Sequence, residues 1–169
     1  SKAITMLGGI TGNNSVTLTT NSSLAVTGNI TAPNVTLNVA AGATQSTTGG
    51  IVTATNSFTL TSGAAVTLGN AANNIGTIAG VTAVGQDVVV KTTGTVAQTG
   101  AINARSLSLE ATGAVTLTNG ANDLYQLAIS SPVSIAYTDA DDVALGVGTL
   151  GVVSGTSSPV TITTTGDLT

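Results

Sequence analysis

The chain has 169 residues, of which 41% are hydrophobic but only three are aromatic, and its net charge of −4 results from seven Asp and Glu against three Lys and Arg. Three cations are too few for a nucleic-acid-binding surface, so nucleic acid is excluded as an expected partner. The chain has no His or Cys, and residues 3–86 carry no charge, which argues against acid–base, nucleophilic and metal-assisted catalysis. We therefore expect a protein that is not an enzyme and needs no cofactor.

The hydrophobic residues are spread along the chain and are interrupted by Thr, Ser, Asn and Gly. Although the mean hydropathy is +0.46, no stretch approaches the roughly 20 consecutive apolar residues of a membrane-spanning helix. The first residues lack the pattern of a secretory leader. We expect residues 1–169 to form one segment excised from a longer repetitive chain.

Short strands are predicted where two apolar residues flank a Thr, Ser or Ala. Strand alternation places the flanking residues on one face and the central residue on the other. We expect the first face to fill a narrow core and the second to meet solvent. In chain order, these triplets are Val16-Thr17-Leu18, Leu24-Ala25-Val26, Val35-Thr36-Leu37, Phe58-Thr59-Leu60, Val66-Thr67-Leu68, Leu107-Ser108-Leu109, Val115-Thr116-Leu117, Val133-Ser134-Ile135 and Val160-Thr161-Ile162.

Gly, Asn and Ser between the triplets predict sharp corners, because these residues tolerate the conformations that tight turns require. A longer repeat is also visible. Residues 66–75 recur 49 positions later as residues 115–124, and residues 88–94 resemble residues 160–166. Constant strands joined by variable corners are typical of solenoid proteins, in which each coil contacts only its neighbours.

Two all-β architectures compete for this pattern. A β-sandwich would have longer strands, aromatic anchors and several tight hairpins, whereas Asn119-Gly120 is the one Asn-Gly dipeptide in the sequence. Short strands and a thin aliphatic core favour a parallel β-helix. With about three strands per coil and roughly 20–25 residues in each, we predict about seven to eight coils spaced ~4.8 Å apart.

Several segments resemble the shaft repeats of filamentous-haemagglutinin-type bacterial adhesins, which are exported by two-partner secretion. They are Asn-Ala-Ala-Asn-Asn-Ile-Gly-Thr-Ile-Ala (residues 70–79), Gly-Ala-Val-Thr-Leu (residues 113–117) and Thr-Asp-Ala-Asp-Asp-Val-Ala-Leu-Gly (residues 138–146). The resemblance implies a right-handed β-helix, a surface fibre and an outer-membrane secretion transporter as a partner. The family's secretion domain carries Asn-Pro motifs, whereas Pro33, Pro132 and Pro159 follow Ala or Ser, so the chain resembles the shaft alone.

Asp139, Asp141 and Asp142 form the densest group of acids. Their spacing begins like a Ca²⁺-binding EF-hand loop, but Ala144 replaces its Gly and Leu150 replaces its Glu. We expect these Asp residues to accept hydrogen bonds from nearby backbone at a solvated corner and to form no metal site.

Two other groups of polar residues invite a binding hypothesis. Exposed Thr-x-Thr pairs resemble the flat arrays of ice-binding β-helices, but Asn38, Gly69, Ser130 and Ala136 interrupt the rows, and Thr also suits any exposed strand. Asn13, Asn21, Asn29 and Asn34 begin Asn-x-Ser/Thr sequons, which we interpret as corner residues that can form Asn ladders. The Thr pairs are Thr17/Thr19, Thr59/Thr61, Thr116/Thr118 and Thr161/Thr163.

Lys91, Arg105 and Glu110 would form a sugar-binding or sugar-cleaving patch only if the coils brought them together, and such sparse charges argue against catalysis. We expect a non-catalytic, extracellular shaft of a bacterial surface adhesin, which attaches cells to surfaces or biofilms through a host or biofilm glycan. The alternative is a self-assembling filament subunit without a receptor, whose coils stack end to end because residues 1–9 and 160–169 do not resemble caps.

Overall fold

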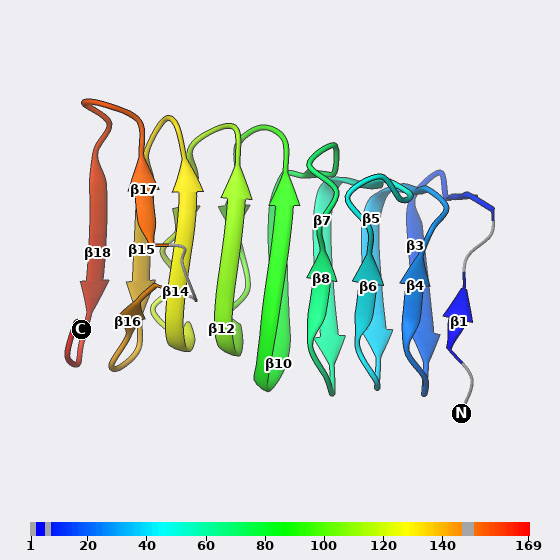
Figure 1. Cartoon of the computed structure of the whole chain (residues 1–169), viewed down its shortest axis with the longest axis horizontal. Helices are drawn as coiled ribbons and strands as arrows, with labels where there is room; N and C mark the ends of the chain where they lie inside the picture. Colours follow the sequence, from blue (N-terminus) through cyan, green and yellow to red (C-terminus); the bar gives the residue numbers. More distant parts are fainter. Residues whose placement is uncertain (1–2, 6–7, 147–150) are drawn as a thin grey trace.

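The computed structural model describes residues 3–5, 8–146 and 151–169, and its regular structure consists of β-strands (Figure 1). Every strand pair in these ranges is parallel. The described ranges contain no helix that would be long and apolar enough to cross a membrane. The predicted all-β parallel fold is therefore confirmed.

The described part of the chain forms 18 strands. The strands before residue 76 are β1 (Ile4–Thr5), β2 (Ile10–Thr11), β3 (Ser15–Thr20), β4 (Leu24–Val26), β5 (Ile30–Val39), β6 (Ala43–Gln45), β7 (Val52–Ser62), β8 (Val66–Leu68) and β9 (Asn74–Ile75). Those after it are β10 (Thr77–Thr92), β11 (Ala97–Gln98), β12 (Ile102–Ala111), β13 (Val115–Leu117), β14 (Asp123–Ser131), β15 (Ile135–Asp139), β16 (Ala144–Leu145), β17 (Val152–Ser154) and β18 (Val160–Thr164).

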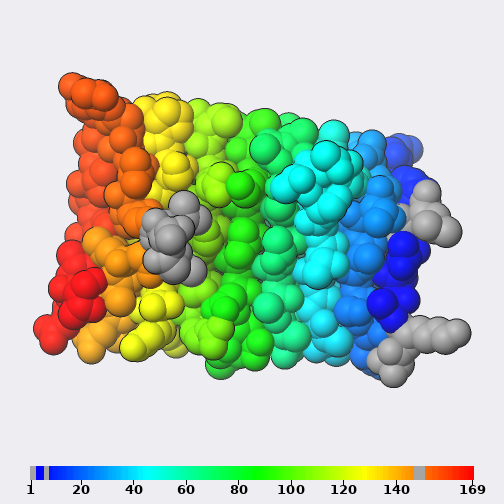
Figure 2. Space-filling view, in the orientation of Figure 1, coloured from blue at the N-terminus to red at the C-terminus, as the bar shows by residue number. Residues whose placement is uncertain are grey.

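The strands wind into a solenoid of about seven turns. The large sheet runs in the order β1-β4-β6-β8-β10-β12-β14-β16, and a second sheet contains β13, β15 and β18. Partner residues in adjacent coils lie between 18 positions apart, at Gln126 and Ala144, and 25 positions apart, at Ile135 and Val160. The coils follow one another in chain order from one end of the molecule to the other (Figure 2). The predicted β-helix is confirmed, with some coils slightly shorter than expected.

The 49-residue repeat does not span a whole number of coils. β8, in the first copy, pairs with β6 and β10 in the large sheet. β13, in the second copy, pairs with β15 in the small sheet. Because 49 residues exceed two coils of about 20 residues and fall short of three, the second copy is turned onto another face of the solenoid.

Aliphatic side chains fill the interior, as the triplets predict. Val66, Leu68, Val115 and Leu117 are fully buried, while the central Thr67 and Thr116 of these two triplets are exposed. Phe58 is among the largest buried side chains, and most of the core consists of Val, Leu, Ile and Ala. The short width of each coil explains why so few aromatic residues are present.

Three triplets depart from the prediction. Val133 is 48% exposed because it lies in the corner before β15, which begins only at Ile135, just as residue 113 lies in the corner before β13. Ser108 is buried although it faces outward, since it is short and lies in register between Val89 and Ala128. Val160 is exposed because β18 pairs on one side only, with β15.

Two adjacent substitutions test the inward and outward assignments. Leu117→Asp should destabilise the protein by more than about 3 kcal/mol, because it places an unpaired carboxylate in the apolar core. Thr116→Asp, on the exposed side of the same strand, should change the free energy of unfolding by about 0.5 kcal/mol or less. Chemical denaturation measures both, and equal losses would contradict the assignment.

Candidate functional site

The described cations, Lys91 and Arg105, lie on the adjacent strands β10 and β12, and each pairs with an acid on the other strand. Lys91 Nζ lies 2.9 Å from Glu110 Oε1. Arg105 binds Asp87 through both nitrogens of its fork, with Nε 2.8 Å from Asp87 Oδ1. The hydrogen bond from Arg105, and after it the bond from Ser106, holds the pKa of Asp87 below its ordinary value. Each described cation is therefore neutralised locally.

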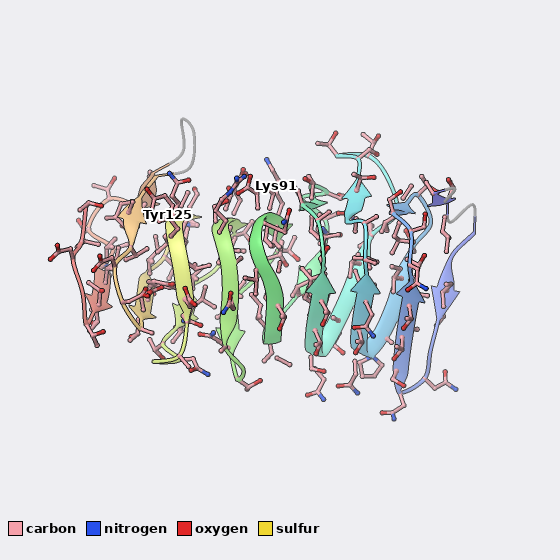
Figure 3. The ribbon with its side chains drawn as sticks, turned by 90° about the horizontal axis from the view of Figure 1, so that it is seen from below. Lys91 and Tyr125 are labelled. Carbon is pink, nitrogen blue, oxygen red and sulfur yellow. The ribbon has the colours of Figure 1, made fainter. Side chains whose placement is uncertain are left out.

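The coils do bring the three predicted charged residues onto one strand pair, but the residues do not converge. Asp87 and Lys91 are four positions apart on β10, a separation of roughly 13 Å. Lys91 and Glu110 line a hollow of about 150 Å³, which Arg105 does not reach. Figure 3 labels Lys91, one of the residues that line this hollow. Two separate neutral ion pairs can contact sugar hydroxyls, but they do not form an acid–base pair around one bond.

A buried amide cluster holds the corner that follows β8. Asn73 Oδ1 accepts hydrogen bonds from Gln45 Nε2 at 2.7 Å and from the Val52 N–H at 2.8 Å. Asn73 Nδ2 donates to Gln45 Oε1 at 2.9 Å and to the carbonyls of Leu68 and Lys91. One side chain thus links backbone groups in successive coils.

The second copy of the repeat builds the same amide cluster after β13. Asn122 Oδ1 accepts from Gln98 Nε2 and from the Ile102 N–H, the latter at 2.9 Å. Asn122 Nδ2 donates to Gln98 Oε1 and to the carbonyls of Leu117 and Thr138. Sequence reasoning found the Asn repeats but missed the Gln partners. The available signal was a Gln ending a strand shortly before a glycine-rich corner, at Gln45 and Gln98.

Asp139 lies in an equivalent corner, fully buried at the end of β15. Its carboxylate accepts hydrogen bonds from the Tyr137 hydroxyl, from the Leu124 N–H at 3.3 Å and from the Asp141 N–H at 3.2 Å. Burial raises the pKa of Asp139, although these hydrogen bonds oppose the rise. Burial and the bond to Asp139 also raise the pKa of the Tyr137 phenol. The expected bonds between Asp side chains and nearby backbone are present, but the corner is not fully solvated as predicted.

The three predicted Asp residues do not share one cavity. Asp139 points inward, whereas Asp141 and Asp142 line an open hollow of about 270 Å³ with Asp123 and Tyr125. Asp142 Oδ1 accepts the Asp167 N–H at 2.6 Å. The described residues contain no group of three or more His, Cys, Asp or Glu side chains placed to hold a metal ion. Leu150, the twelfth position of the EF-hand comparison, lies outside the described residues.

The outward-facing Thr rows are short and interrupted. Thr17, Thr36 and Thr59 are aligned on β3, β5 and β7. In the next row Asn38 lies between Thr19 and Thr61, and its Nδ2 donates to Thr19 Oγ1 at 3.3 Å. Ala136 likewise separates Thr116 from Thr161. The predicted interruptions at Asn38 and Ala136 are confirmed.

Three sequon asparagines, Asn13, Asn21 and Asn29, are corner residues as predicted, whereas Asn34 lies within β5 and belongs to a ladder. Asn34 Nδ2 donates to the Asn14 carbonyl at 2.9 Å, and Asn34 Oδ1 accepts from Asn56 Nδ2 at 2.9 Å. Asn29 Oδ1 accepts the Ile51 N–H. Asn13 and Asn21 are exposed in bends between strands.

A family described as repeats of unknown function (DUF5649) matches residues 77–130. This region runs from the start of β10 into β14, and it contains both ion pairs and the second amide cluster. No curated protein and no solved structure matches the chain. The family match covers less than half of the chain and supports its description as a repeat protein.

The amide cluster after β13 provides a stability test. Asn122→Ala should cost about 2–5 kcal/mol, because it leaves the buried Ile102 N–H without its acceptor and removes the two hydrogen bonds between Asn122 and the Gln98 amide. Asn103→Ala is the matched control. Asn103 makes one exposed bond to Asp123, so its loss should cost about 0.5 kcal/mol or less. Urea denaturation measures both losses. Equal losses in the two variants would show that Asn122 does not hold the corner after β13.

Proposed function

We propose that this chain is a rigid, non-catalytic shaft segment of a secreted bacterial surface adhesin of the filamentous-haemagglutinin type. The observation that carries the proposal is the unbroken order of parallel strands from β1 to β16, closed around an aliphatic core. A solenoid of this kind adds length in proportion to its number of coils. Length and stiffness are the properties that an adhesin shaft needs.

The chemistry of the surface agrees with this proposal. The outward positions of the first coils carry Thr, Ser and Asn, and the described cations further along are neutralised by Asp87 and Glu110. Hydroxyl and amide groups form hydrogen bonds with glycans or hydrated surfaces that are weak singly and add up over a long face. The cell-surface location and the secretion transporter rest on the resemblance to haemagglutinin-type shafts.

An attachment assay tests the adhesive role. Beads carrying the chain should bind glycan-coated glass under flow, and replacing Thr17, Thr36 and Thr59 singly with Ala should each lower attachment by less than about twofold, because multivalent contacts share the binding energy. The triple variant should lose more than any single variant. Bare beads control for non-specific adhesion. Abolition of binding by one Thr substitution would instead indicate a localised receptor site, and binding no better than that of bare beads would reject adhesion.

The second candidate is a self-assembling filament, and the surface at the β1 end favours it. Ile4, Ile10, Leu18 and Leu24 line an apolar hollow of about 150 Å³ there. At the other end, Leu168 is half exposed beside β18. Unpaired parallel edges with apolar rims are templates for another copy of the chain.

Electron microscopy and sedimentation distinguish the filament from the monomeric shaft. The filament hypothesis predicts thin fibres of the isolated chain at high concentration and low salt, with a ~4.8 Å repeat along the axis. Ile4→Lys should suppress them, since it places a charge on the apolar rim. Thr5→Lys, at the neighbouring outward position, is the control. A chain that stays monomeric under these conditions would rule out the filament.

A further inference from the structure

At the same corner of the two copies of the 49-residue repeat, an equivalent backbone N–H donates to chemically different side chains. In the first copy, Thr92 Oγ1 accepts the buried Ile75 N–H at 2.8 Å. In the second copy, Asp139 Oδ2 accepts the equivalent Leu124 N–H. A neutral hydroxyl at one corner is thus replaced by a fully buried carboxyl at the other.

The groups that face Asp139 offer no positive charge. The Tyr137 hydroxyl and the Asp141 N–H donate to its carboxyl, whereas Asp123 of β14 and Asp142 of the following turn line the neighbouring open hollow. Among the strands that pair with β15, neither β13 nor β18 contains a charged residue, and Asp167 follows β18. The described cations are engaged on β10 and β12. Ionising the Asp139 carboxyl therefore places a negative charge with no facing cation in a poorly solvated site.

This corner also holds the next coil in place. The Val143 N–H donates to the Asp167 carbonyl at 3.0 Å, and the Asp167 N–H donates to Asp142 Oδ1 at 2.6 Å. The hydroxyls of Thr164 and Thr165 donate to the carbonyls of Asp141 and Ala140. The turn that contains Asp139 is consequently the contact surface for residues 164–167.

We propose that residues 139–142 and 164–167 form an acid-strengthened latch, which holds the coil of β18 on the coil of β15 more tightly in mild acid than near neutral pH. Burial raises the pKa of Asp139 in the folded chain above its unfolded value. The ionised carboxyl therefore destabilises the latch at neutral pH, and stability is gained as the pH falls through the folded-state pKa. A loosened latch exposes the edge of β15, so pH controls access to that edge.

The pH dependence of the latch is opposite to that expected for the Asp87–Arg105 ion pair between β10 and β12. Asp87 has a lowered pKa, so its contribution to stability is present above its ordinary pKa and is lost as the pH falls through the lowered value. Acid should therefore loosen the Asp87 pair and tighten the latch. This contrast within one molecule separates the latch from a general effect of pH on the fold.

Hydrogen exchange of the β18 amides measures the latch. After correction for intrinsic exchange, these amides should be protected on the order of tenfold more at about pH 4.5 than at about pH 7.5. Asp139→Asn keeps an acceptor for the Leu124 N–H, and it should give high protection at both pH values. Glu110→Gln, which changes a carboxyl on β12 outside the latch, should keep the pH dependence. Equal protection of the unmodified chain at both pH values, or a pH effect that persists in Asp139→Asn, would overturn the proposal.

A second readout does not require the Asp139 variant to fold. The chain has no Trp and two Tyr, so Tyr125→Phe leaves Tyr137 as its sole tyrosine. A phenol that is hydrogen-bonded to an ionised carboxylate fluoresces weakly, so emission should rise as Asp139 becomes protonated. A midpoint above the ordinary pKa of Asp supports the latch, and a midpoint at or below that value contradicts it.

Discussion

The structure depends on one constraint, which is that the backbone hydrogen bonds of each strand are completed by the next coil. Because the strands are parallel and in register, a residue that faces inward in one coil lies above an inward-facing residue of the coil before it. Val16, Val35 and Phe58 form such a column, and Thr17, Thr36 and Thr59 form the outward column beside it. A narrow interior and a polar exterior then follow from a single period-two pattern.

The corners are where this constraint is hardest to meet. Coil lengths vary, so some backbone groups at the corners have no strand partner, and buried side chains supply one. Asn73 and Asn122 do so as neutral amides, and Thr92 does so as a hydroxyl. Within the described residues, no buried side-chain nitrogen or oxygen lacks a hydrogen-bond partner. Asp139 fills the same role with a titratable group, which makes one corner sensitive to pH.

The strands and the core were predictable because each triplet carries its own pattern. Val66 and Leu68 face inward for reasons that can be read from three residues. The face on which a repeat falls was not predictable, since it depends on the summed lengths of all intervening corners. The partners Gln45 and Gln98 were missed because they lie 28 and 24 positions from their Asn residues. The burial of Asp139 was missed because its neighbours Asp141 and Asp142 indicated a solvated corner.

Whole coils are the units of this protein, and the duplication of one coil tests this directly. A second copy of residues 16–34, inserted after Asn34, adds the 19 positions that separate Val16 from its partner Val35. We expect a folded chain with one more set of slowly exchanging amides, about 4.8 Å longer. A second copy of residues 25–34 alone would put the first coil out of phase, and it should lose protection in β1 to β3. If both insertions gave the same exchange pattern, whole coils would not be the units of the fold.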